Sequence, residues 1–438
     1  MADVDRPNVL VFFTDQQRWD TVGAYGSPLD LTPNLDAAAA EGTVVETAVT
    51  SQPVCAPARA CLQTGQHATT HGVYTNAGTL PDVDHLLART FDRAGYETGY
   101  VGKWHIAGTV TDPVPEGDRG GYRDYWRVAD SLEHTSHPYE GFLYDEAGER
   151  VEFDGYRADA LTDMAVEFIE RDRDAPFFLT LSQVEPHHQN DMEAYVAPEG
   201  YAYDHRNPWV PPDLRGRPGD WHEELPDYYG ICERLDECYG RVLGALAEAG
   251  VLDETVVLFV SDHGSHFRTR NGEYKRSCHE SSVRVPMVFR GPGFEGGNRV
   301  STPVSLVDVA PTLLDAAGIA VPDAMEGESI VPFVGDSPEP DRDAFIQTSE
   351  AQVGRALRTD RWKYAVYAPE ADSQATPQPD EYVERYLYDL AADPYEGTNL
   401  VGREEYREVA DDLRRRLRER IEAVEGESAT IRRAAFHA

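Results

Sequence analysis

Short apolar runs that end in charged or polar residues recur along this chain, separated by longer segments of helical periodicity. The clearest run is NVLVFFT at 8–14, and Asp15 follows it at once. Runs of this kind are typical of strands buried on both faces of a parallel sheet. We expect strands at 8–14, 97–105, 176–188, 255–264 and 285–291. We expect helices between them at 33–41, 84–94, 156–172, 227–250 and 305–318. The alternation predicts an α/β fold built on a large, mostly parallel sheet.

The pattern changes near residue 335. A linker-like stretch, GDSPEPDRD, is followed by short strand-like runs and then by a charged amphipathic helix at 404–425. These features predict two domains: an α/β domain of 1–335, and a C-terminal subdomain of 336–438 with a small antiparallel sheet and a packed helix. Two stretches rich in Gly, Pro and aromatic residues, 109–155 and 189–225, have little periodicity, and we expect them to be long surface insertions.

The chain is strongly acidic, with 78 Asp and Glu against 40 Lys and Arg and a net charge of −38. A surface of this charge repels nucleic acid and anionic membranes, so neither is expected as a partner. It suits a cytosol at molar salt, where the screening length falls to about 3 Å. The sequence contains only Lys103, Lys275 and Lys363 as lysines. We therefore predict a halophilic, haloarchaeal type of protein, in which Lys363 is interpreted as a chance survivor.

Membrane and export signals are not evident. No apolar run approaches the ~18 residues of a membrane span. The opening MADVDRPNVLVFFTD lacks a basic segment and a cleavage pattern. We expect a cytoplasmic protein.

Polar side chains follow four of the expected strands at the point where each strand ends. They are Asp15 and Gln16, Lys103 and His105, His187 and His188, and Asp262 and His263. In open α/β sheets, ligands bind in the crevice outside the carboxyl ends of the strands. The sequence therefore predicts that these groups meet at one edge of the sheet.

This set has the chemistry of a cation site beside an anion site. The oxygens of Asp15, Gln16 and Asp262 are hard ligands that suit Ca²⁺ or Mg²⁺, and His263 could complete the set. The basic groups form a clamp for a small anionic group, namely Lys103, Lys275, Arg59 and the histidines. A helix beginning at Cys55 would add its free N–H groups to that clamp.

The motifs around these residues occur in an order that resembles one known family. CAPAR at 55–59, with TG at 64–65, is similar to the C-x-P-x-R modification signature of type I sulfatases. GKWH at 102–105 is similar to that family's Gly-Lys-x-His. Further matches are NVLVFFTDQQ, SDHG at 261–264, EYKRSCHESSVRVPMVFRGPG at 273–293 and LYDLAADPYEGTNLV at 387–401. The ordered set covers nearly the whole chain.

The resemblance implies an alkaline-phosphatase-like α/β/α sandwich and a sulfuric-ester hydrolase. It also implies that a maturase oxidises Cys55 to formylglycine, whose hydrate has two hydroxyls. One hydroxyl would attack the sulfur of a sulfate ester, and the other would lose its proton so that sulfate departs. The substrate implied is the sulfate ester of a sugar or small alcohol, with a sulfamate as an open alternative.

The resemblance also implies roles for individual residues. Ca²⁺, preferred over Mg²⁺ or Mn²⁺, would be held by Asp15, Gln16, Asp262, His263 and the modified Cys55. Arg59 and His105 would bond the hydrate. Lys103, His187 and Lys275 would bind sulfate oxygens, and His187 or Lys275 would protonate the leaving alcohol. His187 is preferred to His188 because it directly follows Pro186. Asn271 flanks the site and is a candidate for contacting the rest of the substrate.

Two alternatives stay open. A phosphonate or phosphate diester hydrolase of the same fold could share the modified cysteine, although GKWH favours sulfate. A non-catalytic anion-binding protein would result if Cys55 stayed unmodified.

Overall fold

The computed structural model describes residues 6–335 and 337–435, and its centre is an 11-stranded sheet. Five neighbouring strands in the middle of this sheet run parallel. In spatial order they are β10 (Thr255–Ser261), β1 (Asn8–Thr14), β9 (Phe177–Ser182), β4 (Glu97–Lys103) and β5 (Tyr125–Ala129). All seven residues of β1 are buried, as its uninterrupted apolar run predicts.

The edges of the sheet contain antiparallel pairs, so the sheet as a whole is mixed. On one side lie β12 (Met287–Arg290), β2 (Thr43–Val45) and β13 (Asn298–Val300). On the other lie β7 (Glu140–Tyr144), β6 (Ser136–His137) and β8 (Arg150–Asp154). A separate three-stranded sheet contains β11 (Arg284–Val285), β3 (Ala48–Val49) and β14 (Val304–Ser305).

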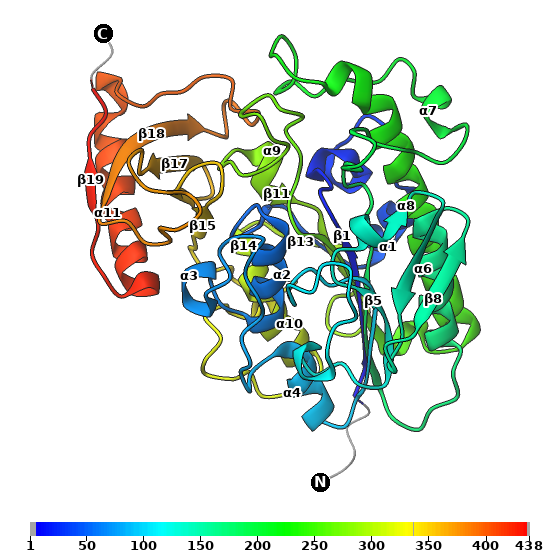
Figure 1. Ribbon diagram of the computed structural model, residues 1–438. Helices are drawn as coiled ribbons and strands as arrows, with labels where there is room; N and C mark the ends of the chain where they lie inside the picture. Colours follow the sequence, from blue (N-terminus) through cyan, green and yellow to red (C-terminus); the bar gives the residue numbers. More distant parts are fainter. Residues whose placement is uncertain (1–5, 336, 436–438) are drawn as a thin grey trace.

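Helices cover both faces of the large sheet, which gives the expected α/β/α layers (Figure 1). The alternation of side chains along β1 shows why two cores form: Leu10 and Phe12 face one core, and Val9, Val11 and Phe13 face the other. The first core is closed by α1 (Pro33–Glu41), α6 (Arg157–Ile169) and α8 (Trp221–Glu248). The second is closed by α2 (Cys55–Thr64), α4 (Leu87–Arg93) and α10 (Val309–Ala316).

Short helices fill the connections between these elements. The α-helical turns are α3 (Ala68–His71), α5 (Leu132–Thr135), α7 (Tyr201–Asp204) and α9 (Glu280–Val283). The 3₁₀ turns are Trp19–Thr21, Gly23–Tyr25, Glu116–Asp118, Leu252–Glu254, Leu306–Asp308, Val331–Phe333 and Glu404–Tyr406. No helix in the described part of the chain is long and apolar enough to cross a membrane.

A second, smaller sheet forms what we call the C-terminal unit, residues 344–432. Its strands are β15 (Ala344–Thr348), β16 (Gly354–Arg358), β17 (Trp362–Tyr367), β18 (Glu381–Asp389) and β19 (Thr430–Arg432). The first four are antiparallel, as expected, and β19 adds a parallel edge. Helix α11 (Arg407–Glu425) packs its apolar stripe on this sheet, at one end of the molecule (Figure 1). The boundary expected between 335 and 336 falls where residue 336 lies outside the described residues, and it stays a prediction.

Two sequence expectations about this fold were wrong. The stretch 109–155 is not a surface insertion: it supplies β5 to the parallel core and β6–β8 to the edge. Lys363 is not a chance survivor, because its ammonium is fully buried at 2.6 Å from Glu280 and 3.0 Å from Glu396. It therefore joins the C-terminal unit to α9 through buried charge.

Candidate active site

The ends of β1, β4 and β10 converge as the sequence predicts. Asp15 and Gln16 follow β1, and Asp262 and His263 follow β10, its parallel neighbour. The backbone N–H of Gln16 donates to Asp262 Oδ1 at 3.0 Å, which ties the two strand ends together. Gln16 has a left-handed φ of 73°, which turns the chain sharply at this point. All four side chains are fully buried.

Cys55 is the first residue of α2, and the start of this helix points at the strand ends. Its Sγ lies 2.8 Å from Lys275 Nζ, 3.4 Å from His263 Nε2 and 3.7 Å from Asp15 Oδ1. One turn later, Arg59 is on the same face of the helix. Its guanidinium lies 3.1 Å from Asp15 Oδ2 and 3.6 Å from a carboxylate oxygen of Asp262.

Four of the predicted metal ligands form a compact buried cluster. Ligand atoms of Asp15, Cys55, Asp262 and His263 all lie within 4.8 Å of one another. The fifth, Gln16, donates its Nε2 to the Tyr195 hydroxyl at 2.6 Å, and its Oε1 accepts a long hydrogen bond from Lys275 Nζ at 3.5 Å. The structure therefore brings four of the five predicted ligands into one cluster, with Gln16 beside it, and their role as metal ligands stays a prediction.

The protonation of this cluster fits a divalent cation. Burial, the Asp15 carboxylate and the Cys55 sulfur raise the pKa of Asp262 well above its usual value. Its buried Oδ2 accepts no hydrogen bond from any described residue. A cation bound here would neutralise that repulsion.

His263 fits the same role. Burial and then the charge of Lys275 lower the pKa of His263 to about 4, so its ring is neutral at neutral pH. Its Nδ1 lies 3.0 Å from the Gly264 carbonyl, and a proton there leaves the Nε2 lone pair free toward the cluster.

Basic groups form the other half of the site. Burial acts to raise the pKa of the Cys55 thiol, but the ammonium groups of Lys103 and Lys275 lower it well below its usual value. Burial and the Cys55 sulfur act to raise the pKa of Asp15, but the opposing charge of Lys103 leaves it below its usual value. Lys275 Nζ also lies 3.1 Å from His187 Nε2. The site thus stabilises negative charge at position 55.

The two adjacent histidines, His187 and His188, have different surroundings. His187 faces Lys275, whereas the His188 ring stacks on Tyr274 with centroids 4.5 Å apart. His105, with a left-handed φ of 61°, follows β4, and its ring is one of the groups that lower the pKa of the Cys55 thiol after the larger effects of burial and the two lysines. Asn271 donates its amide to the carbonyl of Lys275 at 3.0 Å, so here it shapes the loop. Its expected contact with substrate stays a prediction.

The sequence missed two polar residues at this site. Glu133, in α5, lies 3.0 Å from Lys103 Nζ, and its buried Oε2 has no hydrogen-bond partner among described residues. Asn76 Oδ1 accepts the Ala56 N–H at 3.1 Å and so caps the helix that carries Cys55. Neither could be found by pattern, since Glu133 lies in the stretch expected to be irregular and Asn76 in a loop.

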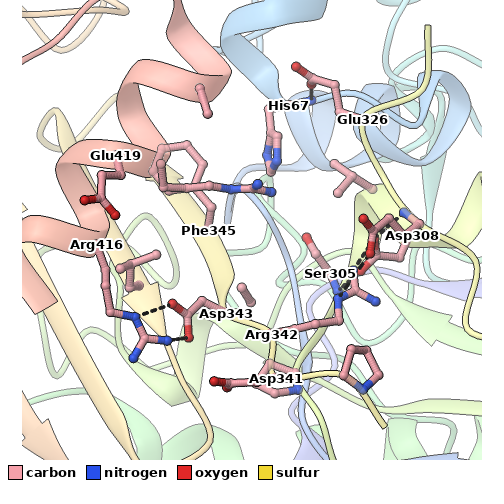
Figure 2. Close-up of a pocket in the computed structure, with 18 residues that line it drawn as sticks. His67, Ser305, Asp308, Glu326, Asp341, Arg342, Asp343, Phe345, Arg416 and Glu419 are labelled. Carbon is pink, nitrogen blue, oxygen red and sulfur yellow. Dashed lines mark hydrogen bonds and ion pairs between the residues drawn. The ribbon is translucent and has the colours of Figure 1, made fainter. Parts of the chain in front are cut away.

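A cavity of about 540 Å³ lies elsewhere, between the C-terminal unit and the part of the chain before residue 344, which we call the large domain (Figure 2). Ion pairs frame it: Arg342 with Asp308 at 2.8 Å, and Arg416 with Asp343 at 2.5 Å. None of the predicted site residues lines it. The cavity is therefore a gap between these two parts of the chain and is separate from the candidate active site.

The fold is the alkaline-phosphatase-like α/β/α sandwich, and comparisons with solved structures agree with it. A Bacteroides fragilis protein assigned to the sulfatases, yidJ, superposes with a TM-score of 0.82 at 23% identity, covering 97% of each chain. A protein solved with its substrate D-glucosamine-2-N,6-O-disulfate superposes with a TM-score of 0.78, also at 23% identity, covering 96% of this chain and 99% of the other. A phosphonate monoester hydrolase from Silicibacter pomeroyi reaches 0.70 at 19% identity, covering 96% of both chains.

Sequence comparisons specify the family. The Sulfatase family model matches residues 7–319, and a model described as "N-sulphoglucosamine sulphohydrolase, C-terminal" matches 272–423. The Ulvan-active sulfatase of Formosa agariphila is 31% identical over 95% of this chain and 81% of its own. The N-acetylglucosamine-6-O-sulfatase of Bacteroides thetaiotaomicron is 26% identical over 95% and 86%. The chain belongs to the sulfatase family and is a sulfuric-ester hydrolase.

Proposed function

We propose that the chain hydrolyses the sulfate ester of a carbohydrate through a formylglycine made from Cys55 by a maturase, with Ca²⁺ at the cluster of Asp15, Gln16, Asp262 and His263. One observation carries the proposal: the buried Cys55 sulfur touches both halves of the site, at 2.8 Å from Lys275 Nζ and 3.4 Å from His263 Nε2. The sugar preference is supported by the names of relatives that act on ulvan and N-acetylglucosamine sulfates.

The oxidised side chain would supply a diol, one hydroxyl for attack on sulfur and one whose deprotonation releases sulfate. Ca²⁺ suits a site of carboxylate and amide oxygens, and it would supply Lewis acidity toward a sulfate oxygen. Arg59 keeps the carboxylates of Asp15 and Asp262 together at the start of α2. This arrangement holds the reacting side chain and the cation site in fixed relation.

The basic groups would bind the anion and move the proton. Lys103 and Lys275 place two ammonium groups around position 55, where they would hold sulfate oxygens and offset charge in the transition state. His187 Nδ1 lies 2.6 Å from the His188 carbonyl and carries the ring proton, so Nε2 accepts from Lys275 Nζ at 3.1 Å. The Lys275 ammonium would then give a proton to the leaving alcohol, directly or through His187. The pair of His187 and Lys275 therefore serves both binding and proton transfer.

Mass spectrometry of the peptide containing position 55 tests the modification, because formylglycine is lighter than cysteine. Turnover of an aryl sulfate against an aryl phosphonate tests the reaction. We expect a modified peptide and a marked preference for sulfate. Cysteine at position 55 in an inactive protein would favour the anion-binding alternative, and faster phosphonate turnover would favour the phosphonate hydrolase.

A variant separates the chemistry from binding. Cys55→Ser keeps one hydroxyl but has no second one to expel sulfate, so we expect at most a single turnover and a stable sulfated serine. Cys55→Ala is the matched control, and we expect it to release no alcohol product, even in a first turnover. Continuous turnover by Cys55→Ser would contradict the diol mechanism.

A further inference from the structure

The first turn of the C-terminal sheet reaches the active site. Glu350 lies in the turn between β15 and β16, and its side chain is 9% exposed. Its Oε1 accepts the backbone N–H of Asn76 at 2.6 Å, and its Oε2 lies 2.5 Å from Arg276 Nε. One carboxylate thus joins two loops of the large domain, and both loops lie beside Cys55.

Each of these two loops hydrogen-bonds a residue next to Cys55 in the sequence or shortly before it. Asn76 caps the helix of Cys55 through the Ala56 N–H. Arg276 follows Lys275, and its own N–H donates to the Pro53 carbonyl at 3.1 Å, just before that helix. Glu350 therefore links the loop that carries Lys275 to the loop that caps the helix of Cys55, at the place where the Lys275 ammonium approaches the Cys55 sulfur.

The backbone at this contact is strained on both sides. Arg276 has φ 66° and Glu350 has φ 62°, which are left-handed values that non-glycine residues seldom adopt. Such conformations persist where surrounding contacts over-determine them, and they cluster at functional sites. Here the ion pair between these two residues is one such constraint, beside the contact of Arg276 with Glu273 at 3.1 Å and the hydrogen bond from the Glu350 N–H to the Ser373 carbonyl at 3.0 Å.

Other contacts dock the same turn. The Gln347 N–H donates to the Ser51 carbonyl at 2.8 Å, and Gln52 Nε2 donates to Ser349 Oγ at 2.7 Å. The segment leading into Cys55 is therefore paired with β15 and its turn independently of Glu350. Removing the Glu350 charge alone should leave the C-terminal unit docked.

We propose that Glu350 is a positioning residue for the sulfatase reaction, acting through Arg276 to set Lys275 against the side chain at position 55. The C-terminal unit would then form part of the active site. The proposal rests on the proposed function, because it takes Lys275 and the modified Cys55 as the reacting groups.

The test compares Glu350→Gln with Glu381→Gln, a control in the same unit whose ion pair with Arg432 is exposed. Aryl sulfate turnover is measured per chain that carries formylglycine, with the thermal midpoint of each variant. We expect Glu350→Gln to lose about tenfold or more in kcat/KM, since charge-assisted hydrogen bonds at a buried pair are strong. Glu381→Gln should match wild type, and Glu350→Asp should recover part of the loss.

A double variant distinguishes positioning from general destabilisation. If Glu350 acts through Arg276, Glu350→Gln, Arg276→Gln and the double variant lose similar factors. Calorimetric titration with inorganic sulfate should show weaker binding in Glu350→Gln. Multiplicative losses in the double variant, activity of Glu350→Gln within about twofold of wild type, or an equal loss in Glu381→Gln would each overturn the proposal. An inactive wild type that still binds sulfate would instead indicate failure of the proposed function.

Discussion

The Lys103 ammonium is shared between two buried carboxylates, Asp15 at 2.8 Å and Glu133 at 3.0 Å. Asp15 is also a candidate metal ligand, so a bound cation would share its negative charge. Glu133 supplies a second negative charge beside the Lys103 ammonium. An anion-binding lysine flanked in this way attracts sulfate less strongly than a free one. In the proposed site, Glu133 would therefore lower the affinity for the substrate anion and for the product.

Replacing Glu133 by Gln should strengthen inhibition by inorganic sulfate. Removing one negative charge near Lys103 is worth ~1 kcal/mol at high effective dielectric, which corresponds to about a fivefold lower inhibition constant. Steady-state inhibition by sulfate measures it, with exposed Glu152→Gln on β8 as the control. An unchanged or higher inhibition constant would show that Glu133 does not moderate this charge.

Chelation should remove both activity and stability. Without a cation, the Asp262 carboxylate is buried next to Asp15 and the Cys55 sulfur. Calcium at 100 times its dissociation constant should raise the free energy of unfolding by about 2.7 kcal/mol. In Asp262→Asn, a tenfold weaker site would give about 1.4 kcal/mol at the same calcium concentration.

Denaturant titrations with and without calcium measure this difference. Asp253→Asn, which alters an exposed carboxylate, is the control. Equal calcium responses in wild type and Asp262→Asn would place the ion elsewhere.

Among the elements, α3 carries a histidine whose protonation opposes folding. Burial lowers the pKa of His71 from 6.5 to about 3. Its Nδ1 accepts the Val73 N–H at 3.1 Å, and its Nε2 lies 3.3 Å from Cys61 Sγ. The folded chain therefore holds the ring neutral.

Acid should destabilise the protein through His71. The unfolded chain takes up a proton below pH ~6.5, and the folded chain does so only near pH 3, so stability falls as pH drops between these values. At pH 5 the loss is about 2 kcal/mol. Other buried histidines contribute too, so the measurement is the difference between wild type and His71→Asn, with exposed His222→Asn as control. Parallel pH profiles would contradict this.

Strands with long apolar runs could be predicted from the sequence. Strands that form only because they pair with a neighbouring strand could not. The run at β1, and Pro33 and Gly42 around α1, predicted these elements to the residue, and the run at β10 predicted its start, whereas its end at Ser261 lies three residues before the expected one. In β8 no side chain is fully buried, so its pairing with β7 leaves little trace in hydropathy. Helix α8 begins at Trp221, six residues before the expected start, because Pro226 reads as a boundary although the helix continues through it.

The same contrast holds at the site. Every predicted ligand and basic group lies at a strand end, a helix start or a recognisable motif, where topology alone brings residues together. Glu133 comes from a helix of only four residues, and Asn76 and Glu350 come from a loop and a turn. Their places depend on tertiary contacts that no local spacing encodes.

For the whole molecule, the net charge of −38 should make stability depend on salt. Self-repulsion among exposed carboxylates is screened as the Debye length falls from about 10 Å at 0.1 M to about 3 Å at 1 M. We expect the free energy of unfolding to rise with KCl at pH 7. At pH 4.6, the isoelectric point of the sequence, the salt dependence should flatten. A decrease with KCl at pH 7 would contradict the predicted halophilic character.

Cys55 is only 1% exposed once the chain has folded. An enzyme that oxidises its sulfur must therefore reach it before the fold closes. The groups that cover it come from residues as distant as His263 and Lys275, and the turn that braces them includes Glu350. During synthesis on the ribosome, these two contacts cannot form until residues 263 and 275 have been made. The wide separation of these contacts along the chain would give the proposed maturase time to act.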